Sequence, residues 1–238
     1  MEIYIESLIK NACDFQAMSD EAREIAREKF RRKETEVENT IRISIDGLIT
    51  SLIKETENKI DIVDKKISFK LTLISSYIRT HFIINDFLLN GDLVEASVLM
   101  RKQLETIVRL NELDSKSLEK LLGKTPNVGN ILKGESGKIY ELLSGIAHSS
   151  SHRIGELLSV VEDGEKVGVS NIPTYSEHAH SGWDLNTFIS FYFLFHLLEC
   201  VENWYPEKDF SEYSNLLFST FAIAVKNGTI NIPEKKKK

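Results

Sequence analysis

Polar side chains suited to acid–base or anion-binding chemistry are concentrated in two segments, residues 93–113 and 137–157. Apolar residues recur in each segment at three- and four-residue steps, which is the spacing of an amphipathic helix. The polar residues lie beside these apolar stripes, so we expect the two helices to bring them together across an interface. The first segment contributes Arg101 and Glu105, and the second contributes Tyr140, Ser144, His148, His152 and Arg153.

These residue types could cleave RNA without a metal ion. The imidazole of His148 could act as general acid or base, Ser144 could donate a hydrogen bond, and Arg101 could hold a phosphate group through two hydrogen bonds. An interpretation in which these residues have only a structural role competes with this one. Tyr, Ser and His beside an apolar stripe also form satisfied networks that tie two helices together, and Arg101 with Glu105 could be a local surface pair.

A metal site has weaker support in the sequence. His148 and His152 have the four-residue spacing that lets two imidazoles share an ion, but no HExxH motif or cysteine ligand accompanies them. Glu156 lies two turns from His148, too far to complete a site on a straight helix. We therefore expect neither a metal nor another cofactor.

Composition indicates an all-α protein. The chain has 238 residues with only 4 prolines and 12 glycines, too few turn formers for an all-β fold. Its net charge of −6 provides no global attraction to nucleic acid, so such contact needs a local basic patch. Residues 27–33 are basic but interleaved with glutamates, which favours a solvated helix surface over a phosphate-binding patch.

The cysteines and the apolar runs indicate a cytoplasmic protein. Cys13 and Cys200 lack the spacing of a disulfide framework or a zinc site, and we expect both to be buried. The richest apolar run begins at Phe188 and is too short to span a bilayer, so no membrane partner is expected.

Helix signals divide the chain into a helical arm, a helical bundle core and a basic tail. The arm covers residues 1–66 and could mediate homo-oligomerisation, the core covers 67–228, and the flexible tail covers 229–238. Ser19 and Asp20 predict a helix start within the arm.

Four boundaries are predicted inside the core. A helix of about 45 Å from Ile60 should stop at Gly91, with Asp92 capping the next helix. Residues 114–136 read as a short helix and a long loop. Residues 155–170 favour helix to Val161 followed by loop, with a β-hairpin turning at Asp163 and Gly164 as the alternative.

The segments LMRKQLE (99–105) and YELLSGIAHSS (140–150) resemble an uncharacterised group of bacterial helical proteins, which in turn is similar to the HEPN-type bundles of prokaryotic defence systems. The resemblance covers roughly residues 67–225. It implies a helical bundle and a role in defence or stress. HEPN ribonucleases carry an Arg followed after four to six residues by a His, and that spacing is absent here.

Two functions remain open on this evidence. The favoured one is a regulatory or binding component of a bacterial defence or stress system, with a polar interhelical pocket for a ligand, RNA or a protein partner. Its binding residues would be Glu105, Tyr140, Ser144, His152 and Arg153. The alternative is a HEPN-like, metal-independent endoribonuclease with Arg101 and His148 as catalytic residues.

Overall fold

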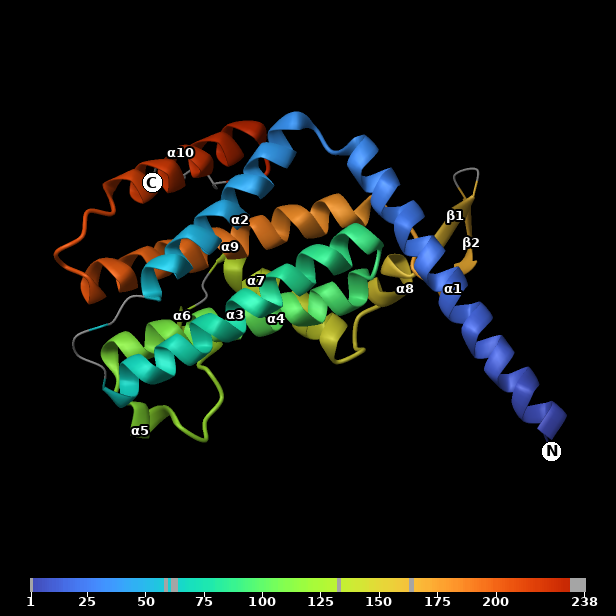
Figure 1. The fold of residues 1–238 in the computed structure, drawn as a ribbon, viewed down its shortest axis with the longest axis horizontal. Helices are drawn as coiled ribbons and strands as arrows, with labels where there is room; N and C mark the ends of the chain where they lie inside the picture. The colour runs from blue at the N-terminus through green and yellow to red at the C-terminus, as the bar shows by residue number, and fades with distance from the viewer. Residues whose placement is uncertain (1, 58–59, 61–63, 132–133, 163–164, 232–238) are drawn as a thin grey trace.

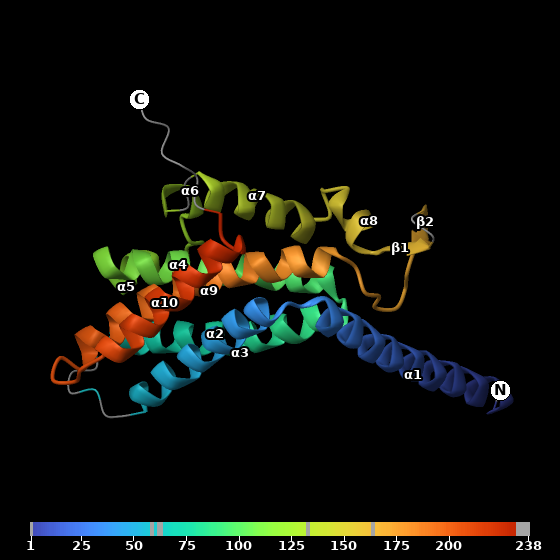
Figure 2. The same ribbon diagram turned by 90° about the horizontal axis from the view of Figure 1, so that it is seen from above.

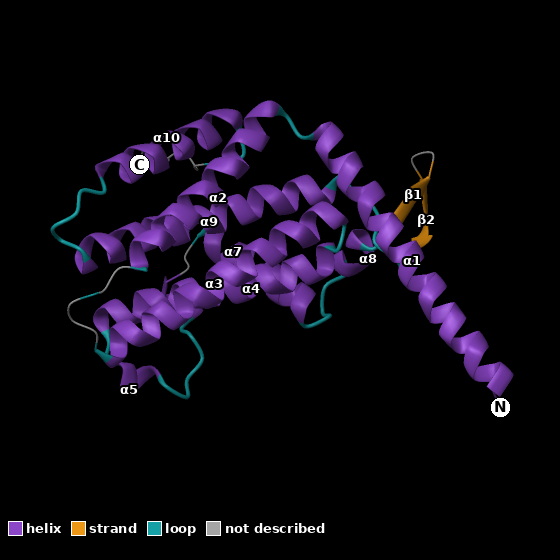
Figure 3. Cartoon of the chain, in the orientation of Figure 1, coloured by secondary structure: helices purple, strands orange, loops and turns teal. Residues whose placement is uncertain are grey.

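The chain forms an all-α helical bundle, as its composition predicts (Figure 1, Figure 3). The computed structural model describes residues 2–57, 60, 64–131, 134–162 and 165–231. The long helices are α1 (Glu2–Lys33), α2 (Glu36–Thr56), α3 (Lys65–Asn90), α4 (Leu93–Ser115), α7 (Glu135–Ala147), α9 (His178–Trp204) and α10 (Ser211–Asn227). The short elements are α5 (Leu118–Leu121), α6 (Val128–Ile131), α8 (Arg153–Leu157), β1 (Ser159–Glu162) and β2 (Glu165–Val169).

Helix α4 lies at the centre of the bundle, packed against α3, α7 and α9. Its apolar stripe is almost fully buried, with Met100, Leu104 and Val108 each at most 1% exposed. Helix α2 packs against α9 and α10 and completes the core (Figure 1). Because α4 is surrounded on several sides, polar residues on its flanks have to find partners on neighbouring helices.

Helix α1 leaves the bundle and projects from it, as both ribbon views show (Figure 1, Figure 2). Residues 4–18 are all exposed, whereas Ser19, Ala26 and Phe30 are buried against the bundle. Phe30 stacks on His180 of α9, with ring centroids 4.3 Å apart. The second half of α1 is therefore anchored to the bundle, whereas the side chains of residues 4–18 are exposed.

The turn between α3 and α4 attaches α1 to the bundle. Gly91 ends α3 in the left-handed conformation, with φ of 82°. Arg27 of α1 donates two hydrogen bonds to the amide oxygen of Asn90, at 3.1 and 2.8 Å. Arg23 pairs with Asp92 at 3.2 Å. Asp92, predicted as an N-cap, makes no capping hydrogen bond and serves this ion pair instead.

Two predicted helix boundaries were wrong. No break occurs at Ser19 and Asp20, because the carboxylate of Asp20 accepts from side chains of α1 rather than from the backbone. Conversely, the helix predicted over 137–157 ends after Ala147 and restarts at Arg153. Ser149 between them has φ of 53°, a left-handed conformation that a helix interior does not contain.

The favoured interpretation of residues 155–170 was also wrong. Strands β1 and β2 pair antiparallel, with a shift in register between Val160 and Val161. The valine-rich sequence suits a strand, and strand pairing prevails over the helical propensity of this segment. Asp163 and Gly164, the predicted turn, lie outside the described residues.

The segments predicted as arm and tail both contribute to the core. Within residues 1–66, helix α2 carries Ile49 and Leu52, both fully buried. Within 229–238, Ile230 is only 4% exposed, and residues 232–238 lie outside the described part of the chain. The helix predicted from Ile60 begins at Lys65, where the carboxylate of Asp64 accepts a hydrogen bond from the backbone N–H of Ile67 at 2.7 Å.

Gly91→Ala is expected to destabilise the protein by about 2–4 kcal/mol. A side chain in this left-handed conformation is strained, and a Cβ at Gly91 would also collide with the carbonyl oxygen of Thr174. Gly228 is the matched control: its φ is 85°, but a Cβ there meets open space. Gly228→Ala should therefore cost only about 1 kcal/mol in urea unfolding. Equal losses in both variants would contradict the role of the Thr174 contact.

Candidate functional site

Arg101, Glu105 and Tyr140 come together where α4 packs against α7. The Tyr140 hydroxyl donates a hydrogen bond to Glu105 at 2.8 Å and accepts one from Arg101 at 3.3 Å. Arg101 and Glu105 also pair directly at 3.0 Å. The guanidinium carbon lies 5.5 Å from the centre of the Tyr140 ring, within cation–π range. We call these three residues the α4–α7 cluster.

The α4–α7 cluster is partly exposed, and its two charged residues pair with each other. The side chain of Arg101 is 23% exposed and that of Glu105 is 30% exposed. The hydrogen bond with Tyr140 raises the pKa of Arg101 and outweighs the opposing effect of partial burial. Its Nε is buried without a hydrogen-bond partner. One terminal nitrogen of the guanidinium, Nη2, thus contacts both Glu105 and Tyr140.

Ser144 and His148 do not join this cluster. Ser144 is half-buried, and His148 is exposed at the C-terminal end of α7. Neither side chain makes a hydrogen bond or ion pair with the described residues. For His148 the end of α7 after Ala147 explains this, because a four-residue row on one helix face cannot continue past the end of the helix. Ser144 lies within α7.

His152 and Arg153 belong to a second place on the surface. The His152 side chain is 91% exposed and lies 3.6 Å from Glu156. Arg153 pairs with the same carboxylate at 2.6 Å and lies 3.4 Å from Nδ1 of His178 at the start of α9. The structure therefore separates Arg101, Glu105 and Tyr140 in the α4–α7 cluster from His152 and Arg153 beside Glu156, and it leaves Ser144 and His148 outside both places.

His178 lines a groove of about 610 Å³ between the end of α1 and the segment that leads into α9. We call it the cationic groove. Its lining residues are Lys29, Arg32, Lys33, Ser159, Tyr175, Ser176, Glu177 and His178. Three fixed positive charges face one carboxylate, so the groove carries a local positive charge on a chain with a net charge of −6.

Two of the groove's basic residues have partners. Lys33 pairs with Glu177, and its ammonium lies 5.1 Å from the centre of the Tyr175 ring. The hydrogen bond from Lys33 lowers the pKa of Glu177. Arg32 pairs with Glu28 at 3.1 Å on the exposed surface of α1. Lys29 has no partner among the described residues, so its charge is available to a ligand.

A buried Asp–His–Ser arrangement crosses α2, α3 and α9. Nε2 of His81 lies 2.7 Å from Asp46, and its Nδ1 lies 3.3 Å from the hydroxyl of Ser190. Ser190 is fully buried and donates to the carbonyl of Asn186 at 2.8 Å. A nucleophile needs access to substrate, so these residues tie three helices together rather than forming a hydrolytic centre.

A second arrangement joins the buried Cys200 and His196 to Asp114, whose side chain is exposed. The thiol lies 3.5 Å from Nε2 of His196, whose Nδ1 lies 3.7 Å from Asp114. Burial raises the pKa of Cys200 to about 11 and lowers the pKa of His196. Because a thiolate is the reactive form of cysteine, this pair is unsuited to nucleophilic catalysis. His196 is a core histidine, as its apolar neighbours in the sequence predict.

In the part of the chain that the structure describes, no group of three or more His, Cys, Asp or Glu is placed to hold a metal ion. The same part contains no helix long and apolar enough to cross a membrane. Comparison with protein-family models, with curated proteins and with solved structures finds no match to this chain. The resemblance to HEPN-type bundles therefore stays a prediction.

Sequence reasoning missed the segment that closes the cationic groove. The basic run at Lys29, Arg32 and Lys33 was visible, but nothing near it in the sequence indicated Tyr175 or His178 as its neighbours. The arrangement of Asp46, His81 and Ser190 did have a signal in the sequence. His81 and Asn85 are spaced by four on the apolar face of α3, where Ile84 and Leu88 are buried. Polar residues at such positions predict a partner on a facing helix.

Tyr140→Phe is expected to lower the free energy of unfolding by about 1 kcal/mol. The substitution removes the hydroxyl that links Glu105 to Arg101 while keeping the aromatic ring. His148→Ala is the control, since the exposed imidazole has no described partner and its loss should stay within about 0.5 kcal/mol. Urea titrations of both variants measure this. An unchanged midpoint for Tyr140→Phe would show that the cluster contributes nothing to folding.

Asp184 of α9 provides a prediction about pH. Burial, followed by the charge of Glu38, raises its pKa from 3.8 to about 6. The folded state then binds more protons than the unfolded state between about pH 4 and 6, so stability falls as pH rises through this window. Asp184→Asn should stabilise the protein by about 1 kcal/mol at pH 8, allowing for solvent screening, and leave it unchanged at pH 4.

Thermal or urea unfolding at the two pH values checks the Asp184 prediction. Asp14→Asn, an exposed carboxylate on α1, should change stability little at either pH. A gain for Asp184→Asn that is equal at pH 4 and pH 8 would contradict the raised pKa.

Proposed function

We propose that this protein is a binding component of a bacterial defence or stress system, and that its ligand is single-stranded RNA held in the cationic groove. The observation that carries the ligand is the convergence of Lys29, Arg32 and Lys33 on a surface cavity that also contains an aromatic ring. The defence or stress context rests on the resemblance to HEPN-type bundles.

The charges in the groove support a phosphate-bearing ligand. Binding to a nucleic acid backbone is driven by release of counterions as Lys and Arg neutralise phosphates. Lys29 is available for such a contact, and Arg32 has only an exposed partner, Glu28, to give up. A surface ion pair of this kind is worth at most about 1 kcal/mol, so a phosphate can replace it at low cost.

The uncharged lining supports a single strand over a duplex. Single-stranded bases stack on aromatic rings, and Tyr175 lies in the groove with Lys33 near its face. Ser159 and Ser176 supply hydroxyls for phosphate or ribose contacts. Arg153, predicted from the sequence as a binding residue, does not line the groove itself but contacts His178, which does.

A ribonuclease centre built on Arg101 and His148 has less support. Arg101 is engaged with Glu105 and Tyr140, and His148 lies exposed beyond the end of that cluster without a described contact to it. General acid–base cleavage needs the imidazole within hydrogen-bond reach of the scissile group while the guanidinium holds the phosphate.

Removal of both Lys29 and Arg32 tests the proposed function. Fluorescence anisotropy with a labelled single-stranded RNA should show that Lys29→Ala/Arg32→Ala weakens binding about tenfold at about 50 mM salt. The slope of log K against log salt should become shallower by about 1.4, since each phosphate contact on a single strand contributes about 0.7. Lys10→Ala/Arg31→Ala is the control, because it removes equal charge from α1 outside the groove.

Equal weakening by the groove variant and its control would overturn the groove as the binding site. Absence of binding at low salt by the unmodified protein would overturn the proposed function. The same RNA incubated with EDTA tests the alternative: cleavage that disappears in both Arg101→Ala and His148→Ala would make the protein a metal-independent ribonuclease.

A further inference from the structure

The projecting half of α1 carries an apolar surface that nothing in the described chain covers. Six large side chains there each expose between 49% and 70% of their surface. We call them the exposed stripe: Tyr4, Ile5, Leu8, Ile9, Phe15 and Met18. Contiguous apolar surface of this extent on a helix indicates a contact with another molecule.

We infer that the exposed stripe pairs with the same stripe of a second copy of this chain, with the two α1 helices antiparallel. This inference is independent of RNA binding, since it uses the opposite end of α1 from the cationic groove. It also differs from the sequence-based expectation of an oligomer contact anywhere in residues 1–66, because α2 is already buried in the bundle.

The charge distribution on α1 favours a self-complementary contact. The charged residues between positions 4 and 18 are Glu6, Lys10 and Asp14. Helical spacing places Glu6 and Lys10 opposite the stripe and Asp14 at its edge, one turn before Met18. Lys10 and Asp14 pair with each other at 2.7 Å. Two copies can therefore bring their stripes together without burying a charge.

The size of the stripe fits a stable dimer. From the exposed fractions, the six side chains offer on the order of 700 Å² in each copy. Two copies would bury roughly 1,400 Å², within the range of about 1,200–2,000 Å² for specific protein–protein interfaces. The short arm alone is thus large enough, and no further contact between the bundles is needed.

The bundle itself decides the relative direction of the two helices. Ser19, Ala26 and Phe30 continue the line of the exposed stripe along α1, and all three are buried by the chain's own bundle. In a parallel pair, the second helix would run along this line into the bundle. An antiparallel partner instead ends where the bundle begins and extends past the free end of α1.

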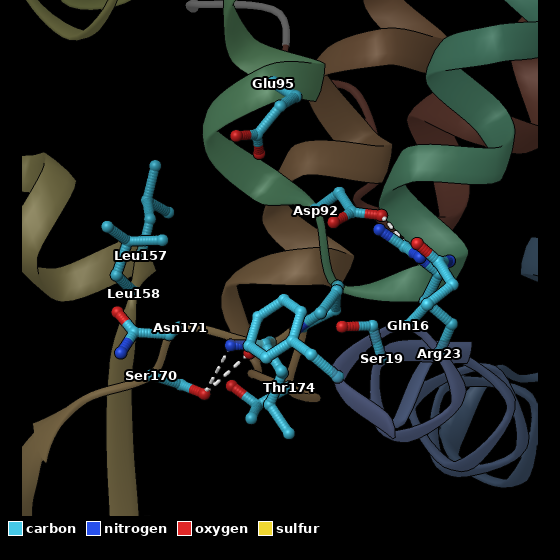
Figure 4. A pocket seen from close by; sticks show the side chains of 14 residues that line it. Gln16, Ser19, Arg23, Asp92, Glu95, Leu157, Leu158, Ser170, Asn171 and Thr174 are labelled. Carbon is cyan, nitrogen blue, oxygen red and sulfur yellow. Dashed lines mark hydrogen bonds and ion pairs between the residues drawn. The ribbon is translucent and has the colours of Figure 1, made fainter. Parts of the chain in front are cut away.

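An antiparallel pair centred on Lys10 brings apolar residues of the two copies opposite one another. It sets Ile5 of one copy opposite Phe15 of the other, and Leu8 opposite Ala12, which lets the side chains interdigitate. Tyr4 of the second copy then lies opposite Gln16, at the rim of a cavity of about 240 Å³ (Figure 4). Asp92, Glu95 and Thr174 line this cavity from the bundle side.

The cavity offers acceptors to the Tyr4 hydroxyl. Glu95 is exposed and has no partner among the described residues, while Asp92 is held by Arg23. Figure 4 shows the two carboxylates on the α4 side of the cavity and Gln16 and Ser19 on the α1 side. An amphipathic tyrosine suits such a site, because its ring can contact Phe15 while its hydroxyl reaches a carboxylate.

A lipid surface fits the stripe less well than a second copy. Helices that lie on membranes carry Lys and Arg on their polar face, which attract anionic lipid headgroups. The polar face of residues 4–18 has two carboxylates and one ammonium instead. Its net negative charge opposes binding to an anionic bilayer.

Light scattering coupled to size-exclusion chromatography tests the inferred dimer. The unmodified protein at about 50 μM should elute with twice the 27.2 kDa of a single chain. Leu8→Asp places a charge in the middle of the interface and should reduce the mass to that of one chain. Ala17→Asp adds the same charge on the outer face of α1 and should leave the mass doubled.

A distance measurement tests the antiparallel direction. Cys13 is exposed, contrary to the expectation from sequence, and Cys200 is buried, so a Cys13→Ser background allows one label at Arg31→Cys. Pulsed electron paramagnetic resonance should give about 60 Å between the spin labels at position 31 of the two copies, from the rise of ~1.5 Å per residue. A separation below about 25 Å would overturn the antiparallel arrangement.

Two outcomes would overturn the dimer: a single-chain mass for the unmodified protein, or a doubled mass retained by Leu8→Asp. In the first case, Leu8-dependent binding to phosphatidylcholine–phosphatidylglycerol vesicles would identify a lipid surface as the partner of the stripe. Circular dichroism of Leu8→Asp should match that of the unmodified protein, because residues 4–18 contribute nothing to the packed bundle. RNA binding by a single-chain Leu8→Asp variant would separate failure of the dimer from failure of the groove.

Discussion

The turn at Asn90, Gly91 and Asp92 is the constraint on which the arrangement of the molecule depends. It joins α3 to α4, receives Arg27 and Arg23 from α1, and brings the backbone of Thr174 against Gly91. This three-residue turn thus links the α3–α4 hairpin, the N-terminal helix and the segment before α9. Both the cationic groove and the projecting half of α1 take their places from it.

Regular helices were predictable because their apolar spacing is local and uninterrupted. The stop at Gly91 followed from a residue type that readily adopts the left-handed conformation at a helix end. Boundaries decided by tertiary contacts were not predictable in this way. Ser19 and Asp20 have capping side chains, yet α1 continues through them, and its second half packs on the bundle. Strands β1 and β2 formed in a segment whose sequence suits both a helix and a pair of strands.

The candidate site shows the same division. Arg101, Glu105 and Tyr140 could be placed together from spacing on two facing helices, since each needs a partner at the edge of a buried stripe. His148 could not be excluded from that row without knowing that α7 ends after Ala147. The groove joins Lys29 to Tyr175 across almost 150 positions of the chain, and no local pattern encodes such a pairing.

Helix α1 has no interruption between Glu2 and Lys33, and this continuity has a consequence for the proposed dimer. A straight helix holds its two ends at a fixed distance, so a pair of chains joined through the exposed stripe would carry its grooves at a set spacing of about 60 Å. An RNA long enough to reach both would bind the second groove at high effective concentration. The dimer would then select RNA molecules by length, because only those long enough to reach both grooves gain from the second contact.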